Sequence, residues 1–145
     1  MVDVSRAELL NEALELFFFA YREFTAYPDE ILAGRGLARV HHRILYFVGR
    51  NPGISVNELL GILGVTKQAL NAPLRRLVEE GLIESMPGAD RRVRELRLTD
   101  AGAALETALT GSQRKRMAAV FADAGPKDEA AWREIMSRIA ARPTD

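Results

Sequence analysis

The stretch that decides the fold is Ser55–Gln68, which reads SVNELLGILGVTKQ. Ser55 and Glu58 form a capping box, in which each side chain can bond to the backbone N–H of the other at the start of a helix. Gly64 suits the left-handed position just after that helix, and Thr66 is placed to cap the next one. Two short helices joined by a tight glycine turn make a helix-turn-helix unit, so the stretch predicts one.

The residues that follow predict a β-hairpin. The second helix continues to Gly81, another glycine stop. Leu82–Met86 then has the composition of a strand, and Pro87–Asp90 that of a turn. Val93–Leu98 alternates apolar and charged residues, as a half-buried strand does. A hairpin in this position is the wing of a winged helix-turn-helix.

The flanking sequences predict helices on both sides of this unit. The expected fold class is therefore mostly α with a small β-hairpin wing, a winged helix-turn-helix with N- and C-terminal dimerisation helices. No linker divides the chain, so we expect one domain over 1–145, with the winged helix at about 37–98 and helical regions at 1–36 and 99–145. The expected helices are Ser5–Tyr27, ended by Pro28 and Asp29, then Leu37–Val48, Asp100–Phe121 and Lys127–Ala140.

The first of these helices is apolar on more than one side. Leu10, Leu14, Phe17 and Tyr21 form a stripe with helical spacing, and Phe18 lies beside it. A helix with such a wide apolar surface has two partners, its own domain and a second subunit. The pattern favours a homodimer.

Charge is unevenly distributed along a chain whose net charge is zero. Residues 1–36 hold three basic and seven acidic side chains, whereas residues 64–98 hold seven basic and five acidic ones. The local basic surface, and not the total charge, decides whether phosphates can bind. A nucleic-acid partner therefore remains compatible with this composition.

Several functional classes are disfavoured by composition. The chain has no cysteine and only two histidines, which argues against a disulfide framework, a thiol switch or a structural zinc site. No Ser/His/Asp arrangement, glycine-rich phosphate loop or metal-ligand spacing is present, so we expect neither an enzyme nor a cofactor. Charges interrupt every apolar run near the N-terminus, so no signal peptide or membrane segment is expected and the protein is assigned to the cytoplasm.

Residues early in the second helix of the helix-turn-helix are the candidate base contacts. In this motif the helix enters the major groove with its N-terminal residues foremost. Amide side chains can contact adenine bidentately, and basic ones can reach guanine or phosphate. The candidates are Thr66, Lys67, Gln68 and Asn71, with Arg75 further along as a phosphate contact.

The hairpin tip carries Asp90, Arg91 and Arg92. An arginine extended from a hairpin can enter a narrow minor groove, where the negative potential is enhanced. Asp90 can hold one of the two arginines in place by a bidentate pair.

These elements together resemble the MarR family of bacterial regulators. The likeness rests on the helix-turn-helix stretch, the run Leu74–Ile83, the wing residues Asp90–Arg92 and the run Leu98–Gly102. It implies a homodimer joined through its N-terminal and last two helices, which binds a pseudo-palindromic operator. It also implies repression that a small, often aromatic, ligand relieves. By this likeness Arg92, supported by Asp90, would be the minor-groove residue.

The second helix of the helix-turn-helix, which begins after Thr66 and continues to Gly81, is the recognition helix. Two of its residues depart from the family pattern. Many members have a Thr-Arg pair where this chain has Asn71 and Ala72. Pro73 lies inside the helix, lacks an N–H for the Ala69 carbonyl, and predicts a kink at a cost of about 3 kcal/mol. A kink would change which bases the N-terminal residues reach.

The resemblance also implies an effector pocket, lined by the second expected helix (Leu37–Val48) together with the first helix and the one at Asp100–Phe121. Its candidate residues are Phe18, Tyr21, His41, His42 and Tyr46. One interpretation of the two histidines is a response to pH or to a metal ion. The simpler interpretation is one hydrogen-bonded core residue and one exposed residue. Neighbouring helical residues point about 100° apart, so His41 and His42 cannot chelate one metal ion together.

One alternative function is compatible with the same fold. A winged helix can serve as a protein-interaction module without binding DNA, but such a module would not need the basic hairpin tip or the polar start of the recognition helix. The sequence does not reveal the operator, the effector, or whether the protein represses or activates transcription.

Overall fold

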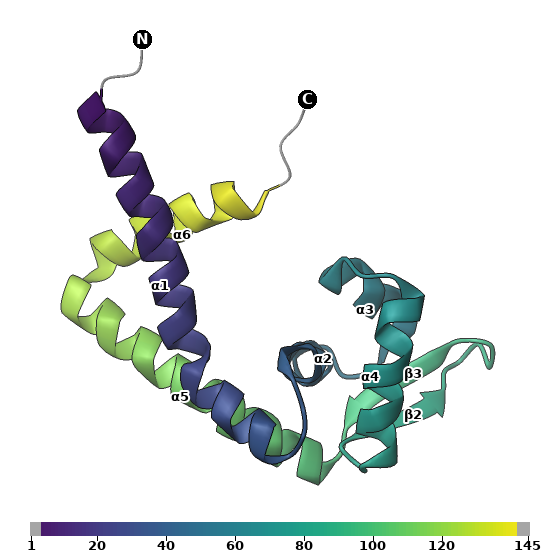
Figure 1. The fold of residues 1–145 in the computed structure, drawn as a ribbon. Coiled ribbons are helices and arrows are strands. Elements are labelled where there is room, and N and C mark those ends of the chain that lie inside the picture. Colours follow the sequence, from purple (N-terminus) through teal and green to yellow (C-terminus); the bar gives the residue numbers. More distant parts are fainter. Residues whose placement is uncertain (1–3, 142–145) are drawn as a thin grey trace. The chain divides into compact units, whose positions relative to one another are not determined.

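The computed structural model, which describes residues 4–141, contains a winged helix-turn-helix built from α2, α3, α4 and a β-hairpin (Figure 1). The expected fold class is confirmed: the structure is mostly helical, with a small antiparallel sheet. The elements in order are α1 (Val4–Gly34), α2 (Arg39–Arg50), β1 (Ile54–Ser55), α3 (Val56–Leu63), α4 (Lys67–Glu79), β2 (Ile83–Pro87), β3 (Arg94–Leu98), α5 (Asp100–Ala124) and α6 (Pro126–Ala140).

The chain divides into two compact units with a boundary between Thr110 and Gly111. The first unit holds α1 to β3 and the start of α5. The second holds the rest of α5 together with α6. In the second unit, the rings of Phe121 and Trp132 meet edge to face with centroids 5.1 Å apart, which joins α5 to α6.

The helix-turn-helix has the caps that the sequence predicts. Ser55 Oγ accepts from the Glu58 N–H at 3.1 Å, and Glu58 Oε1 accepts from the Ser55 N–H at 3.2 Å. Gly64 has the left-handed φ of 66°. Thr66 Oγ1 accepts from the Ala69 N–H at 3.1 Å. The capping interpretation is therefore confirmed: Ser55 and Glu58 cap the start of α3, Gly64 ends it, and Thr66 caps the start of α4.

The core of the first unit lies between these helices and the sheet. Side chains from α2, α3, α4 and the hairpin are almost fully buried there, and their aliphatic surface stabilises the unit by leaving water. They include Ile44, Leu45, Val48, Leu59, Leu70, Leu77, Leu82 and Leu96.

The sheet has three strands in the order β1-β3-β2. The hairpin β2–β3 pairs Ile83 with Leu98, as the expected wing requires. Strand β1 was not expected: Ile54 pairs with Leu96 across it. A strand of only two residues has no alternation to detect, so the sequence gives no periodic signal for it.

The prediction that Pro28 and Asp29 end the first helix is wrong, because α1 continues through Pro28 to Gly34. Pro28 is fully buried, and Leu32, one turn further on, is 1% exposed. Burial of these residues offsets the cost of a proline within a helix. The helix stops instead at Gly36, whose φ is 68°. There the Leu37 N–H bonds to the Leu32 carbonyl at 2.8 Å in a Schellman arrangement.

Helix α5 starts directly against the residues that follow α4. The Thr99 hydroxyl donates to the Gly81 carbonyl at 2.6 Å and accepts from the Gly102 N–H at 3.0 Å. A Cβ on Gly102 would lie 1.9 Å from the Leu82 carbonyl oxygen. Only glycine fits at this junction.

Candidate nucleic-acid interface

Helix α4 has one buried and one exposed face. Leu70 and Leu77 point into the core, at 1% and 0% exposure. Lys67, Asn71 and Arg75 follow one another at intervals of four on the exposed side, with Gln68 next to them. The candidate base contacts therefore lie on one solvent-facing surface of a single helix.

Thr66 has a structural task at the start of this helix. Its hydroxyl oxygen accepts the Ala69 N–H, which leaves the hydroxyl proton free to donate to a phosphate. The first N–H groups of α4 add the positive end of the helix dipole to the same place.

Pro73 is half-buried within α4, and the helix continues through it to Glu79 without a break. The missing N–H removes one bond to the Ala69 carbonyl. Leu70 and Leu77, on either side of Pro73, are both buried. Packing of the apolar face therefore holds the helix together across the proline.

Asp90 organises the hairpin tip. Its Oδ1 accepts from the Arg92 backbone N–H at 3.1 Å and from Arg92 Nε at 3.3 Å, and its Oδ2 accepts from Nη2 at 3.5 Å. The Arg92 side chain is nevertheless 90% exposed. Asp90 thus orients Arg92 without burying it, and Arg91 is also exposed.

Arg94 performs a role that sequence reasoning missed. Its Nε donates to Ser85 Oγ at 3.0 Å, and its Nη2 donates to the Ser85 carbonyl. The two residues lie on neighbouring strands of the wing. Arg94 therefore ties β3 to β2 at the base of the tip, and a diagonal cross-strand pair of this kind can be found only once the register is known.

The five candidate effector residues have different partners. The rings of Phe18 and Phe19 meet edge to face on α1, and those of Tyr46 and Phe47 do so on α2. Tyr21 accepts a hydrogen bond from Arg43 at 3.0 Å.

His41 and His42 occupy different environments on α2. His41 is 8% exposed, and its Nδ1 accepts from the Ala38 N–H at 2.9 Å, which places the neutral ring at the helix N-terminus. His42 is half-buried, and its Nε2 lies 3.0 Å from Thr110 Oγ1. Burial lowers the pKa of both histidines. His41 is thus the expected core histidine, whereas the expectation that its neighbour is exposed is wrong.

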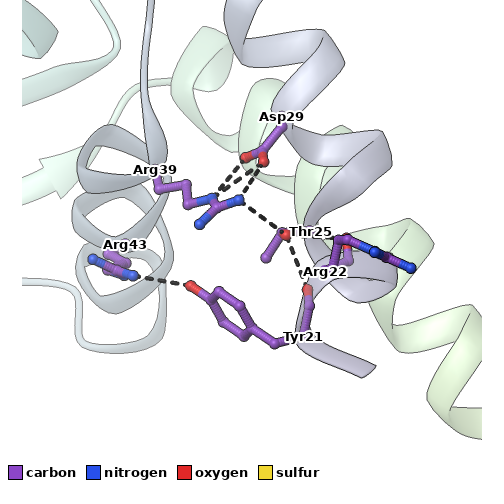
Figure 2. Close-up of polar contacts among 6 residues, drawn as sticks. All are labelled: Tyr21, Arg22, Thr25, Asp29, Arg39 and Arg43. Atoms are coloured by element: carbon purple, nitrogen blue, oxygen red, sulfur yellow. Dashed lines mark hydrogen bonds and ion pairs between the residues drawn. The ribbon is translucent and has the colours of Figure 1, made fainter. Parts of the chain in front are cut away.

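A polar ladder joins α1 to α2 (Figure 2). Asp29 accepts from Arg39 Nη2 at 2.8 Å and from Nε at 3.1 Å, while Arg39 Nη2 also reaches Thr25 Oγ1 at 3.3 Å. Tyr21, Thr25 and Asp29 are spaced by four on α1, as Arg39 and Arg43 are on α2. The sequence alone does not reveal the ladder, because a helix that ends at Pro28 and Asp29 would not present this spacing.

No helix within residues 4–141 is long and apolar enough to cross a membrane. Over the same residues, no group of three or more His, Asp or Glu side chains is placed to hold a metal ion.

The exposed polar face of α4, followed by an arginine-tipped hairpin, defines a winged-helix DNA-binding protein. The model of the MarR family matches residues 35–93, which run from the end of α1 to the wing. A curated relative, the HTH-type transcriptional regulator PetP of Rhodobacter capsulatus, is 48% identical over 133 residues, which cover 91% of this chain and 80% of PetP. The chain belongs to the MarR family of DNA-binding transcriptional regulators, which are not enzymes.

Solved structures agree in fold. A MarR family regulator from Silicibacter pomeroyi is 20% identical with a TM-score of 0.77, and the match covers 99% of each chain. A MarR family protein of Mycobacterium tuberculosis, in complex with p-aminosalicylic acid, is 23% identical with a TM-score of 0.58 and coverage of 88% and 97%. At this level of identity the likeness shows the fold alone.

Proposed function

We propose that the protein is a homodimeric repressor that binds a pseudo-palindromic operator and is released by a small-molecule effector. The observation that carries the operator contacts is the arrangement of Asp90 and Arg92, because an exposed guanidinium held in a fixed orientation suits insertion into a minor groove. Membership of a DNA-binding regulator family supports the same role.

The recognition helix supplies the major-groove contacts in this proposal. Gln68 and Asn71 read base edges, and Lys67 contacts a base or a phosphate. Thr66 and Arg75 bind phosphates on either side and set the register, and Arg91 assists at the wing. All of these side chains lie in exposed positions.

The dimer rests on an apolar surface that the first unit leaves uncovered. Leu10, Leu14, Phe17 and Tyr21 on α1 are between 41% and 70% exposed. Contiguous exposed apolar surface of this kind marks a protein interface. In the proposed division of the chain, residues 1–36 and 99–145 form the dimerisation region, and in α6 the exposed Trp132, Ile135 and Ile139 are consistent with it.

The proposed effector is a small aromatic acid bound beside α1 and α2. Its candidate contacts are Phe18, Tyr21, His41, His42 and Tyr46. The support is the M. tuberculosis relative's complex with p-aminosalicylic acid and the arginine next to the Tyr21 hydroxyl, a donor pair that suits a carboxylate.

The test is fluorescence anisotropy on DNA from upstream of the protein's own gene, with random DNA of the same length, across a salt series. Wild type should bind the upstream DNA more tightly, with a steep dependence on salt. Arg92→Ala should weaken specific binding about tenfold or more, the expected cost of a lost groove contact. Arg50→Ala is the control, because Arg50 is an exposed arginine at the end of α2, outside both the proposed DNA contacts and the proposed dimerisation region.

Equal and weak binding to both DNAs, unchanged by Arg92→Ala, would contradict the proposed operator contacts. If wild type binds the upstream DNA, p-aminosalicylate added to the complex then tests release. Retention of the complex at millimolar ligand argues against an aromatic-acid effector.

A further inference from the structure

We propose that Arg76 is a positioning residue that fastens the recognition helix α4 to the C-terminal end of α1. Arg76 contacts no DNA in this proposal. It sets the direction of the helix that does, and its effect on operator binding therefore rests on the proposed function.

The guanidinium of Arg76 uses each of its three nitrogens. Nη1 donates to the Gly36 carbonyl at 2.6 Å and Nη2 donates to the Arg35 carbonyl at 3.1 Å. Nε lies 3.4 Å from Glu80 Oε2 on α4 itself. The guanidinium thus binds two consecutive carbonyls of the turn after α1, while its Nε forms an ion pair with Glu80 on its own helix.

The carbonyls at this place carry partial negative charge. A helix C-terminus leaves carbonyl groups without intrahelical partners, and its dipole attracts cations. Here the Leu32 and Ala33 carbonyls accept the backbone N–H groups of residues 35–37. Arg76 supplies donors to the carbonyls of Arg35 and Gly36 in the turn that follows, so it binds the C-terminal end of α1 from another helix.

Gly36 is an independent sign of the same contact. A Cβ on Gly36 would lie 3.2 Å from Arg76 Nη2, closer than nearly all real Cβ contacts, and its φ is 68°. Glycine therefore serves both the turn and the close approach of the guanidinium.

Neighbouring positions on α4 show why this contact governs direction. Arg75 faces solvent on the proposed DNA side, and Leu77 is fully buried. Apolar packing against the core is not directional and tolerates small rotations of a helix. Two hydrogen bonds from a planar fork fix an orientation, and Arg76 makes them to a different helix.

Helix α1 meets the winged helix at a second place, through the ladder of Asp29 and Arg39 to α2 (Figure 2). The C-terminal half of α1 is therefore bonded to α2, and the turn directly after it is bonded to α4. Its N-terminal half carries the exposed apolar stripe of the proposed dimer. Arg76 is a direct polar link between the end of the proposed dimerisation helix and the recognition helix.

The experiment compares wild type with Arg76→Gln, Arg76→Lys and Glu80→Gln. Glu80→Gln is the matched control, because it removes the ion pair and keeps both carbonyl bonds. Anisotropy on the upstream and random DNAs across a salt series is combined with amide hydrogen exchange of the α4 segment in the DNA-free protein. The unfolding midpoint of each variant is recorded.

Arg76→Gln should lower specific affinity about tenfold and leave the affinity for random DNA and the salt slope unchanged, because no phosphate contact is lost. Exchange in α4 should become faster in Arg76→Gln, and Glu80→Gln should stay within about twofold of wild type in both measurements. Arg76→Lys should have a specific affinity and an α4 exchange rate between those of Arg76→Gln and wild type, since one amine can reach one carbonyl. If Arg76→Gln does not fold, Arg76→Lys is the variant that tests the proposal.

Two results would overturn the proposal. In the first, Arg76→Gln reduces the slope of log affinity against log salt concentration by about one and lowers the affinity for both DNAs equally. Arg76 would then be a phosphate contact. Unchanged exchange in α4 would mean that the bonds to α1 do not hold the helix. If wild type itself fails to prefer the upstream DNA, the proposed function fails, and the exchange measurement alone decides the role of Arg76.

Discussion

Asp90 binds the backbone N–H and the guanidinium of Arg92 with one carboxylate, although the Arg92 side chain is 90% exposed. An exposed ion pair by itself contributes little to stability. The value of this pair lies in orientation, since a guanidinium already aimed outward loses less conformational entropy when it enters a groove.

Asp90→Ala should therefore weaken operator binding by about threefold to tenfold, less than Arg92→Ala, because the arginine remains but is no longer oriented. The free energy of unfolding of Asp90→Ala should be almost the same as that of wild type. The double variant should bind no more weakly than Arg92→Ala alone, since Asp90 acts through Arg92. Additive losses in a double-mutant cycle, measured by anisotropy, would contradict this coupling.

Gly102→Ala should destabilise the protein by about 2–4 kcal/mol, because the new Cβ would lie 1.9 Å from the Leu82 carbonyl oxygen. Denaturant unfolding measures the effect. Gly111→Ala, in the same helix with nothing within 4 Å of its Cβ position, is the control and should be neutral or stabilising. If both substitutions changed the free energy of unfolding equally, helix propensity and not the close contact with Leu82 would account for the effect.

Stability should fall as the pH drops below about 6.5, the ordinary pKa of histidine. Burial lowers the pKa of His41 in the folded protein, so below 6.5 the unfolded chain takes up a proton that the folded one does not. Protonation of Nδ1 would also remove the bond from the Ala38 N–H.

His41→Gln should flatten this pH dependence, because glutamine can still accept at the same capping position and does not titrate. Denaturant unfolding between pH 5.5 and 7.5, on the order of one unit to either side of the ordinary value, measures the difference. His42→Gln is the comparison, since the pKa of His42 is lowered too. An identical pH profile for wild type and His41→Gln would contradict the assignment.

Leu14→Glu should convert the proposed dimer to a monomer. Leu14 is 70% exposed in the single chain, so the substitution costs the monomer almost nothing but places a charge in the apolar interface. Sedimentation equilibrium measures the change. Ile62→Glu is the matched control, because Ile62 is 47% exposed on α3 outside the proposed interface. A Leu14→Glu protein with the mass of wild type would place the interface elsewhere.

Local signals were enough to predict the helix-turn-helix and the wing. Ser55, Glu58, Gly64 and Thr66 act within one or two turns of their own positions, so a residue pattern reveals them. The exposed face of α4 follows from the same logic, since helical spacing separates Leu70 and Leu77 from Lys67 and its neighbours.

Contacts between distant segments could not be predicted in the same way. The continuation of α1 past Pro28 depends on burial supplied by the fold, and that error concealed Asp29 as the partner of Arg39. The bonds of Arg76 to the turn after α1 span 40 and 41 residues, a separation that no local pattern encodes. Strand β1 forms only by pairing with the distant strand β3, where Ile54 lies opposite Leu96.

The contact of Gly102 with Leu82 limits how the winged helix can move on the start of α5. A carbonyl so close to a backbone without a side chain leaves no room for α5 to slide along the hairpin. The Thr99 hydroxyl, bonded on both sides, lies at the same point. We therefore expect any change of angle between the hairpin and α5 to be a rotation about this joint and not a sliding movement.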